Sequence, residues 1–126
     1  MADNKYSFDR SDRISQQLHR EIARLFLSEI NDPRLEDVQV VDVESTPDLR
    51  VARVYYTMMH GEAPGDQVQP ALEGVTGFVK NQLASVLELR YIPQIEFVFD
   101  KSVLKARRID DLLSGLDDDD VDNDPQ

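Results

Sequence analysis

The spacing of apolar residues changes along this chain, and that change restricts the possible fold more than any other feature. Between residues 11 and 30, apolar side chains recur every three or four positions, which is typical of a helix with one buried face. Residues 49–59 are rich in valine, tyrosine and threonine with a two-residue repeat at Val51, Arg53, Tyr55 and Thr57, and Ile95, Phe97 and Phe99 alternate with Glu96, Val98 and Asp100; both patterns are typical of strands. A chain of 126 residues that contains both periods is expected to fold as one α+β domain.

Capping and turn residues set the expected boundaries of these elements. Ser11 is a candidate N-cap for the first helix, and Pro33 ends it because proline disfavours helical backbone in the preceding residue. Pro47 presets a turn over residues 46–49, which predicts an antiparallel hairpin. The expected elements are a helix over 11–30, strands over 38–44 and 49–59, a helical region over 66–87, a strand over 95–99 and a short helix over 103–113.

Two glycines interrupt the helical repeat of residues 66–87. Gly74 and Gly77 each weaken a helix interior by about 1 kcal/mol relative to alanine. Their position predicts two helices separated by a kink at Val75, Thr76 and Gly77, or a close approach of another backbone.

The charge is distributed unevenly along the chain. The net charge is −11, but residues 110–126 contain eight Asp and no base, so residues 1–109 carry 17 acids and 14 bases. Residues 74–109 carry six bases and three acids, and a second basic group lies near the N-terminus at spacings that put several of its members on related helical faces: Arg10, Arg13, Arg20 and Arg24. These regions predict positive surface patches suited to nucleic acid.

The composition excludes several classes of chemistry. Without cysteine, the chain cannot form disulfides, thiolate zinc sites or cysteine nucleophiles. We find no apolar run long enough to span a membrane and no apolar stretch near Met1 that could act as a secretory signal, so we expect a cytoplasmic protein. We expect no metal and no cofactor, because His19 and His60 lie far apart in the sequence and no catalytic motif is present.

Residues 114–126 form an acidic tail that is expected to be disordered, because it repels itself and has few apolar groups. We interpret it as a solvated tail; competition with RNA for the protein's own basic surface and loose cation binding are the alternatives. The expected organisation is an arm over 1–10, a domain over 11–113 and this tail.

Several short motifs, in order, resemble the bacterial ribosome-binding factor A family over residues 8–113. The resemblance implies a type II KH-like domain of order α-β-β-α-(kink)-α-β, with a three-stranded sheet and helices packed on one face. The family has an Ala-x-Gly kink where this chain has Val75-Thr-Gly77, and Gly74 completes a literal Gly-x-x-Gly, the loop with which other KH domains clamp nucleic acid. The motifs are Arg13-Ile14, Glu21-Ile-Ala23, Asn31-Asp-Pro-Arg-Leu35, Asp48-Leu49, Ala52-x-Val54-Tyr55, Gly77-Phe78, Arg90-x-x-Pro93, Phe97-x-x-Asp100-x-Ser102 and Arg108-Ile109.

The resemblance implies a monomeric, non-catalytic factor that binds the free small (30S) ribosomal subunit and its rRNA during late maturation and rRNA processing, with other assembly factors as further partners. Arg34 either contacts RNA or ties the end of the first helix to the hairpin, and we favour the structural role. Of Tyr55 and Tyr56, at most one can stack on a base, because they point to opposite sides of the sheet. The expected RNA-binding residues are Arg10, Arg13, Lys80, Arg90, Lys101, Lys105, Arg107 and Arg108.

Two other function classes are compatible with an α+β domain of this size. An adaptor would use the sheet to dock a protein, with the acidic tail reaching a basic partner and no direct RNA contact. An enzyme would need acid–base or metal chemistry from His19 and His60 with nearby carboxylates, and His60-Gly-Glu62 lies in a predicted loop, where such sites are common.

Overall fold

The computed structural model describes residues 2–102, 109, 112 and 113, with side chains from residue 10 onward. Its elements are helix α1 (Ala2–Ser28), a 3₁₀ turn η1 (Pro33–Leu35), strands β1 (Val38–Ser45) and β2 (Val51–Met58), helix α2 (Val68–Val86) and strand β3 (Gln94–Phe99). Both the α+β class and the three-stranded sheet are confirmed, and the arrangement is consistent with a type II KH-like fold. Most of the expected short helix over 103–113 and all of the tail over 114–126 lie outside the described residues.

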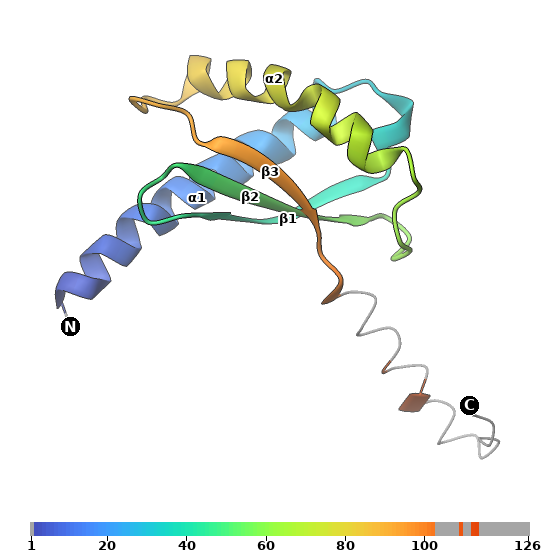
Figure 1. Cartoon of the computed structure of the whole chain (residues 1–126), viewed down its shortest axis with the longest axis horizontal. Coiled ribbons are helices and arrows are strands. Elements are labelled where there is room, and N and C mark those ends of the chain that lie inside the picture. The colour runs from blue at the N-terminus through green and yellow to red at the C-terminus, as the bar shows by residue number, and fades with distance from the viewer. Residues whose placement is uncertain (1, 103–108, 110–111, 114–126) are drawn as a thin grey trace.

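The sheet has the strand order β1-β2-β3, and both helices pack on one face of it (Figure 1). Strands β1 and β2 are antiparallel, which confirms the hairpin, whereas β2 and β3 are parallel. The parallel pair requires a long crossover, which α2 provides. The register of β1 shifts between Val40 and Asp42, so Val41 is left outside the pairing and is 40% exposed.

The core lies between this sheet face and the two helices. Helix α1 contributes Leu18, Ile22 and Leu25, which follow the predicted helical period, and all three are fully buried. Polar bonds fix the layers against each other: Ser45 N–H donates to Ser15 Oγ over 3.0 Å, joining β1 to α1. The other buried residues of the core include Ala52, Val54 and Tyr56 of β2, Ile95 and Phe97 of β3, and Leu72, Val79 and Leu83 of α2.

A second polar connection fixes the start of α2 over the sheet. The Tyr56 hydroxyl donates to Gln69 Oε1 over 2.8 Å, and Gln69 Nε2 donates to the Phe97 carbonyl over 3.0 Å. The amide of Gln69 therefore bridges two strands, and the buried tyrosine hydroxyl has a partner.

The structure corrects two expectations about the helices. Helix α1 begins at Ala2, so Ser11 lies inside it and is not an N-cap. Helix α2 is continuous from Val68 to Val86, so the division into two helices is wrong. Neither Gly74 nor Gly77 has a positive φ, and a Cβ at either position would have no neighbouring atom within 4 Å, so no other backbone approaches closely there.

Candidate nucleic-acid interface

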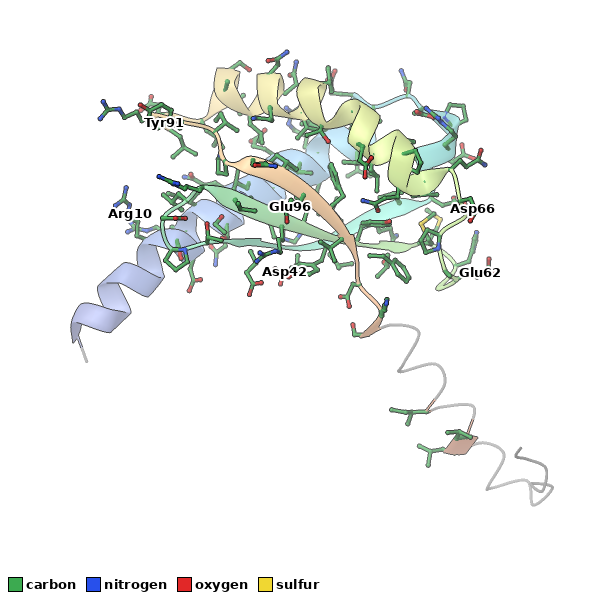
Figure 2. All side chains as sticks on the ribbon, in the orientation of Figure 1. Arg10, Asp42, Glu62, Asp66, Tyr91 and Glu96 are labelled. Carbon is green, nitrogen blue, oxygen red and sulfur yellow. The ribbon has the colours of Figure 1, made fainter. Side chains whose placement is uncertain are left out.

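Three segments that are distant in the sequence meet at one end of the molecule. The Ser15–Ser45 bond holds α1 beside the end of β1, and Gln94 N–H donates to the Arg50 carbonyl over 2.8 Å, which holds the start of β3 beside the hairpin turn. We call this region the hairpin end; it comprises α1 up to Ser15, the turn over 46–50 and the loop over 87–93. Figure 2 shows Arg10 of α1 and Tyr91 of the loop at this same end.

The hairpin end carries four exposed arginines from these three segments. Arg10 and Arg13 come from α1 and, within the described residues, neither forms an ion pair. Arg50 lies 3.9 Å from Asp48 with its side chain 84% exposed, a contact that stabilises little because water surrounds it. Arg90 lies over the ring of Tyr91. The described carboxylates of this end are Asp12, Asp48 and Glu88.

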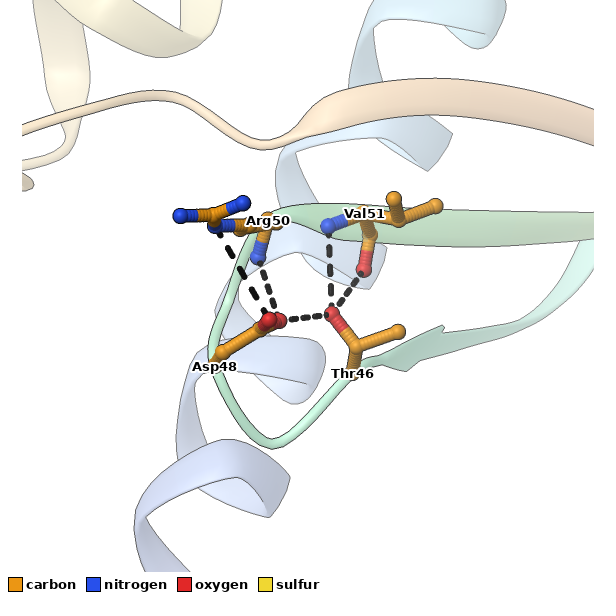
Figure 3. Close-up of polar contacts among 4 residues, drawn as sticks. All are labelled: Thr46, Asp48, Arg50 and Val51. Carbon is orange, nitrogen blue, oxygen red and sulfur yellow. Dashed lines mark hydrogen bonds and ion pairs between the residues drawn. The ribbon is translucent and has the colours of Figure 1, made fainter.

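The hairpin turn itself engages one of these carboxylates (Figure 3). The Thr46 hydroxyl donates to Asp48 Oδ1 over 2.8 Å and Arg50 N–H donates to the same atom over 3.1 Å. These two hydrogen bonds, the hydroxyl's first, hold the pKa of Asp48 below its usual value. Val51 N–H in turn donates to Thr46 Oγ1 over 3.1 Å, so Asp48 is an ionised part of the turn rather than a free group.

Lys101 lies away from the hairpin end. It follows β3, whose six residues span about 20 Å, so Lys101 and Arg90 lie at opposite ends of that strand. Their separation exceeds the roughly 8 Å screening length at physiological salt, so the two cations do not form one patch. The expected contacts Lys105, Arg107 and Arg108 lie outside the described residues.

The remaining expected site residues lie in α2. Lys80 is half-buried beside the buried Val79 and has no ion pair within the described part of the chain. Val75 packs against the core, and the Thr76 hydroxyl donates to the Leu72 carbonyl. Residues 74–77 are therefore helical, and they do not form the loop that a Gly-x-x-Gly clamp needs.

The sheet face that the helices leave open is acidic. It carries Asp42, Glu44 and Glu96, and Figure 2 shows Asp42 on the side away from α2. Its one arginine, Arg53, lies 3.6 Å from Glu96. The Tyr55 hydroxyl donates to Glu44 over 3.1 Å, and partial burial, followed by this carboxylate, raises the pKa of Tyr55. Because phosphates would be repelled here, we do not expect RNA to bind this face.

Two expectations about single residues can be compared with the structure. Tyr56 is 1% exposed, which confirms that at most Tyr55 of that pair is available for stacking. Arg34 donates from Nε and Nη2 to both carboxylate oxygens of Asp32, over 3.0 and 2.6 Å, which lowers the pKa of Asp32. This bidentate pair supports the structural role of Arg34, but it closes η1 locally and does not reach the hairpin.

No three His, Asp or Glu side chains gather into a possible metal site within the described residues. The described helices also include none that is long and apolar enough to cross a membrane.

Sequence reasoning missed two residues of the hairpin end. Arg50 follows the predicted turn and Tyr91 follows Arg90, so both stand beside residues that were recognised. Only the packing of three separate segments shows that they lie together.

Comparison with known proteins agrees with the fold. Residues 10–113 match the family described as ribosome-binding factor A. A ribosome-binding factor A of Methylobacillus flagellatus is 41% identical over 123 residues, covering 94% of this chain and 96% of that protein. The crystal structure of ribosome-binding factor A from Thermus thermophilus aligns with a TM-score of 0.62 at 24% identity, covering 71% of this chain and 93% of that one.

A third comparison involves a ribosomal complex. A homology model of the Thermus thermophilus ribosome binding factor A, fitted into a cryo-EM map of a 30S–RbfA complex, aligns with a TM-score of 0.58 at 25% identity. It covers 69% of this chain and 91% of that one. The match over 10–113 and the 41% identity over nearly the full length of both proteins assign the family. This chain belongs to the ribosome-binding factor A family.

Proposed function

We propose that this protein binds the free 30S ribosomal subunit in the cytoplasm, as a monomer, and assists late folding and processing of its rRNA without catalysing a reaction. The observation that carries the proposal is the similarity to the Thermus thermophilus protein placed in a 30S–RbfA complex. A protein in this role needs no catalytic group, because a shape-complementary surface with exposed cations is sufficient to hold structured RNA.

The hairpin end is the first proposed RNA contact. Arg10, Arg13, Arg50 and Arg90 point into solvent there, and arginine binds phosphate through two parallel hydrogen bonds. Lys101, with Lys105, Arg107 and Arg108, forms the second proposed contact, and Lys80 adds a cation from α2. Each neutralised phosphate releases counterions, so binding through these residues weakens as salt rises.

Two variants that remove the same number of charges test the proposal. One reverses Arg10, Arg13, Arg50 and Arg90 to Glu, and the other reverses Lys101, Lys105, Arg107 and Arg108 to Glu. We expect both to reduce co-sedimentation with free 30S subunits and to flatten the slope of log affinity against log salt by about three units for four lost phosphate contacts. The control is Arg34→Gln, which removes an arginine already paired with Asp32 and should leave the slope unchanged.

If both four-fold variants co-sediment as the wild-type protein does, the proposed RNA contacts are wrong. The acidic open face then favours the second candidate, an adaptor that docks a Lys- and Arg-rich protein segment on Asp42, Glu44 and Glu96. Binding by an adaptor would survive nuclease treatment of its partner and would be lost when these three residues are changed to Gln or Asn.

A further inference from the structure

Tyr91 is the most exposed aromatic side chain in the described part of the protein. It is 75% exposed, whereas Phe78 is 38% exposed and Tyr56 is buried. The ring of Tyr91 contributes little to the core of the domain, and tyrosine is a residue type enriched at binding interfaces because it offers both an apolar ring and a hydroxyl.

The loop holds this ring in a defined place. Pro93 is fully buried and Ile92 packs against the core, so the backbone on one side of Tyr91 is anchored. On the other side, the guanidinium carbon of Arg90 lies 5.7 Å from the centroid of the ring, within the range of a cation–π contact. The anchored backbone and the contact with Arg90 limit the positions that are open to the ring, which lowers the entropy cost of binding.

The surroundings of Tyr91 determine which partner fits. Together with Arg90, the residues Arg10, Arg13 and Arg50 give this end four arginines against three described carboxylates, Asp12, Asp48 and Glu88, and Asp48 is engaged by hydrogen bonds within the turn. Tyr55, by contrast, is half-buried on the acidic face with its hydroxyl bound to Glu44. An exposed ring among arginines is the combination with which proteins bind single-stranded nucleic acid, since bases stack on the ring and cations hold the phosphates.

We propose that Tyr91, supported by Arg90, stacks on one unpaired base of the bound RNA. The inference rests on the proposed function, because it takes RNA as the partner, and it adds that the RNA at the hairpin end is single-stranded. Duplex RNA keeps its bases stacked inside the helix and offers no face to the ring.

The chain contains no tryptophan, so Tyr91→Trp places a single fluorescent reporter at the site. The full-length variant is titrated at low salt with a 12-nucleotide oligoadenylate and with an RNA duplex that has the same number of phosphates. We expect fluorescence quenching by the single strand and little by the duplex. The matched reporter is Leu27→Trp, at an 88% exposed position near the other end of α1, which should not respond to either RNA. Equal quenching at both reporters would contradict a stacking site at Tyr91.

Affinity gives a second, independent readout. Tyr91→Ala should weaken oligoadenylate binding about 5- to 150-fold, the range measured for loss of one stacked base. Tyr91→Phe should bind as the wild-type protein does, because it keeps the ring, and circular dichroism should show the same fold for all variants. Duplex affinity should stay unchanged in each.

The possible failures are distinguishable. If Tyr91→Ala binds oligoadenylate normally while the four-fold arginine variant of the hairpin end does not, the stacking site is overturned and RNA binding by this end stands. If Tyr91→Ala weakens binding to 30S subunits but not to oligoadenylate, Tyr91 contacts protein and the inference is also wrong. If the wild-type protein binds no RNA and charge reversal does not affect 30S binding, both this inference and the proposed function fail.

Discussion

At the scale of single residues, Thr46 connects the two sides of the hairpin turn through hydrogen bonds of both its backbone and its hydroxyl. Leu49 N–H donates to the Thr46 carbonyl over 2.8 Å, which closes the turn around Pro47 as expected. The Thr46 hydroxyl then accepts from Val51 N–H and donates to Asp48, and Leu49 takes a φ of 60°, which is uncommon for a residue other than glycine. The hydrogen bonds of the hydroxyl therefore offset part of the strain at Leu49.

Replacing Thr46 by valine should destabilise the protein by about 1–2 kcal/mol, because Val51 N–H would lose its partner while the shape of the side chain is kept. The measurement is the free energy of unfolding from urea titration followed by circular dichroism. Thr46→Ser is the control, since it restores the hydroxyl and should recover most of the loss. Equal stability of the valine and serine variants would show that the hydroxyl contributes nothing.

At the scale of elements, α2 shows how packing overrides local propensity. Two glycines one turn apart would weaken an isolated helix, yet α2 continues through them because Leu72, Val79 and Leu83 are fully buried against the sheet. Helix α1 likewise extends to Ala2, although its apolar repeat starts only near residue 14. The apolar repeat indicates which part of a helix packs against the core, but the helix itself can begin several turns earlier.

Changing Gly74 or Gly77 to alanine should stabilise the protein, because a Cβ at either position meets no atom within 4 Å and alanine favours the helix. We expect a gain of about 0.5–1 kcal/mol for each variant, measured as an increase of about 3–6 °C in the melting temperature. Ala84→Gly, at an exposed position of the same helix, is the matched control and should cost a similar amount.

The same variants test whether flexibility at the expected kink, Val75, Thr76 and Gly77, is needed for binding to 30S subunits. If Gly77→Ala raises the melting temperature and leaves 30S binding unchanged, flexibility at this position is not needed for function. A fall in 30S binding with a higher melting temperature would support a functional kink that costs stability.

At the scale of the whole molecule, the fold places acidic and basic side chains on different surfaces. The open sheet face carries carboxylates, the hairpin end carries four arginines, and Lys101 lies beyond the far end of β3. The net charge of the whole chain is therefore a poor guide to its partners, because at physiological salt a partner senses only the charges within about 8 Å of the surface that it contacts.

Deletion of residues 117–126 removes six Asp and changes the net charge from −11 to −5. We expect the melting temperature to stay the same and the affinity for 30S subunits to stay the same or to rise, because the deletion removes negative charge and no predicted core residue. A full-length variant with these six Asp changed to Asn separates charge from length. A large loss of 30S affinity in the truncated protein would show that the tail takes part in binding.

The sequence by itself determined the class of the fold, the hairpin, the third strand and the family resemblance. These follow from local patterns: the period of apolar residues, a proline in a turn, and short motifs in a fixed order. The expectation that Tyr55 and Tyr56 face opposite sides of the sheet also needed only the two-residue repeat of a strand.

Only the tertiary structure decided which cations share a surface. Arg10, Arg50 and Arg90 follow one another at intervals of 40 residues, and their segments lie at the same end of the molecule because β1 turns back at Thr46 and β3 starts beside Arg50. Arg90 and Lys101 are close in sequence but are held apart by an extended strand. Side-chain proximity depends on the path of the backbone through three dimensions, and a charge count along a segment contains no information about that path.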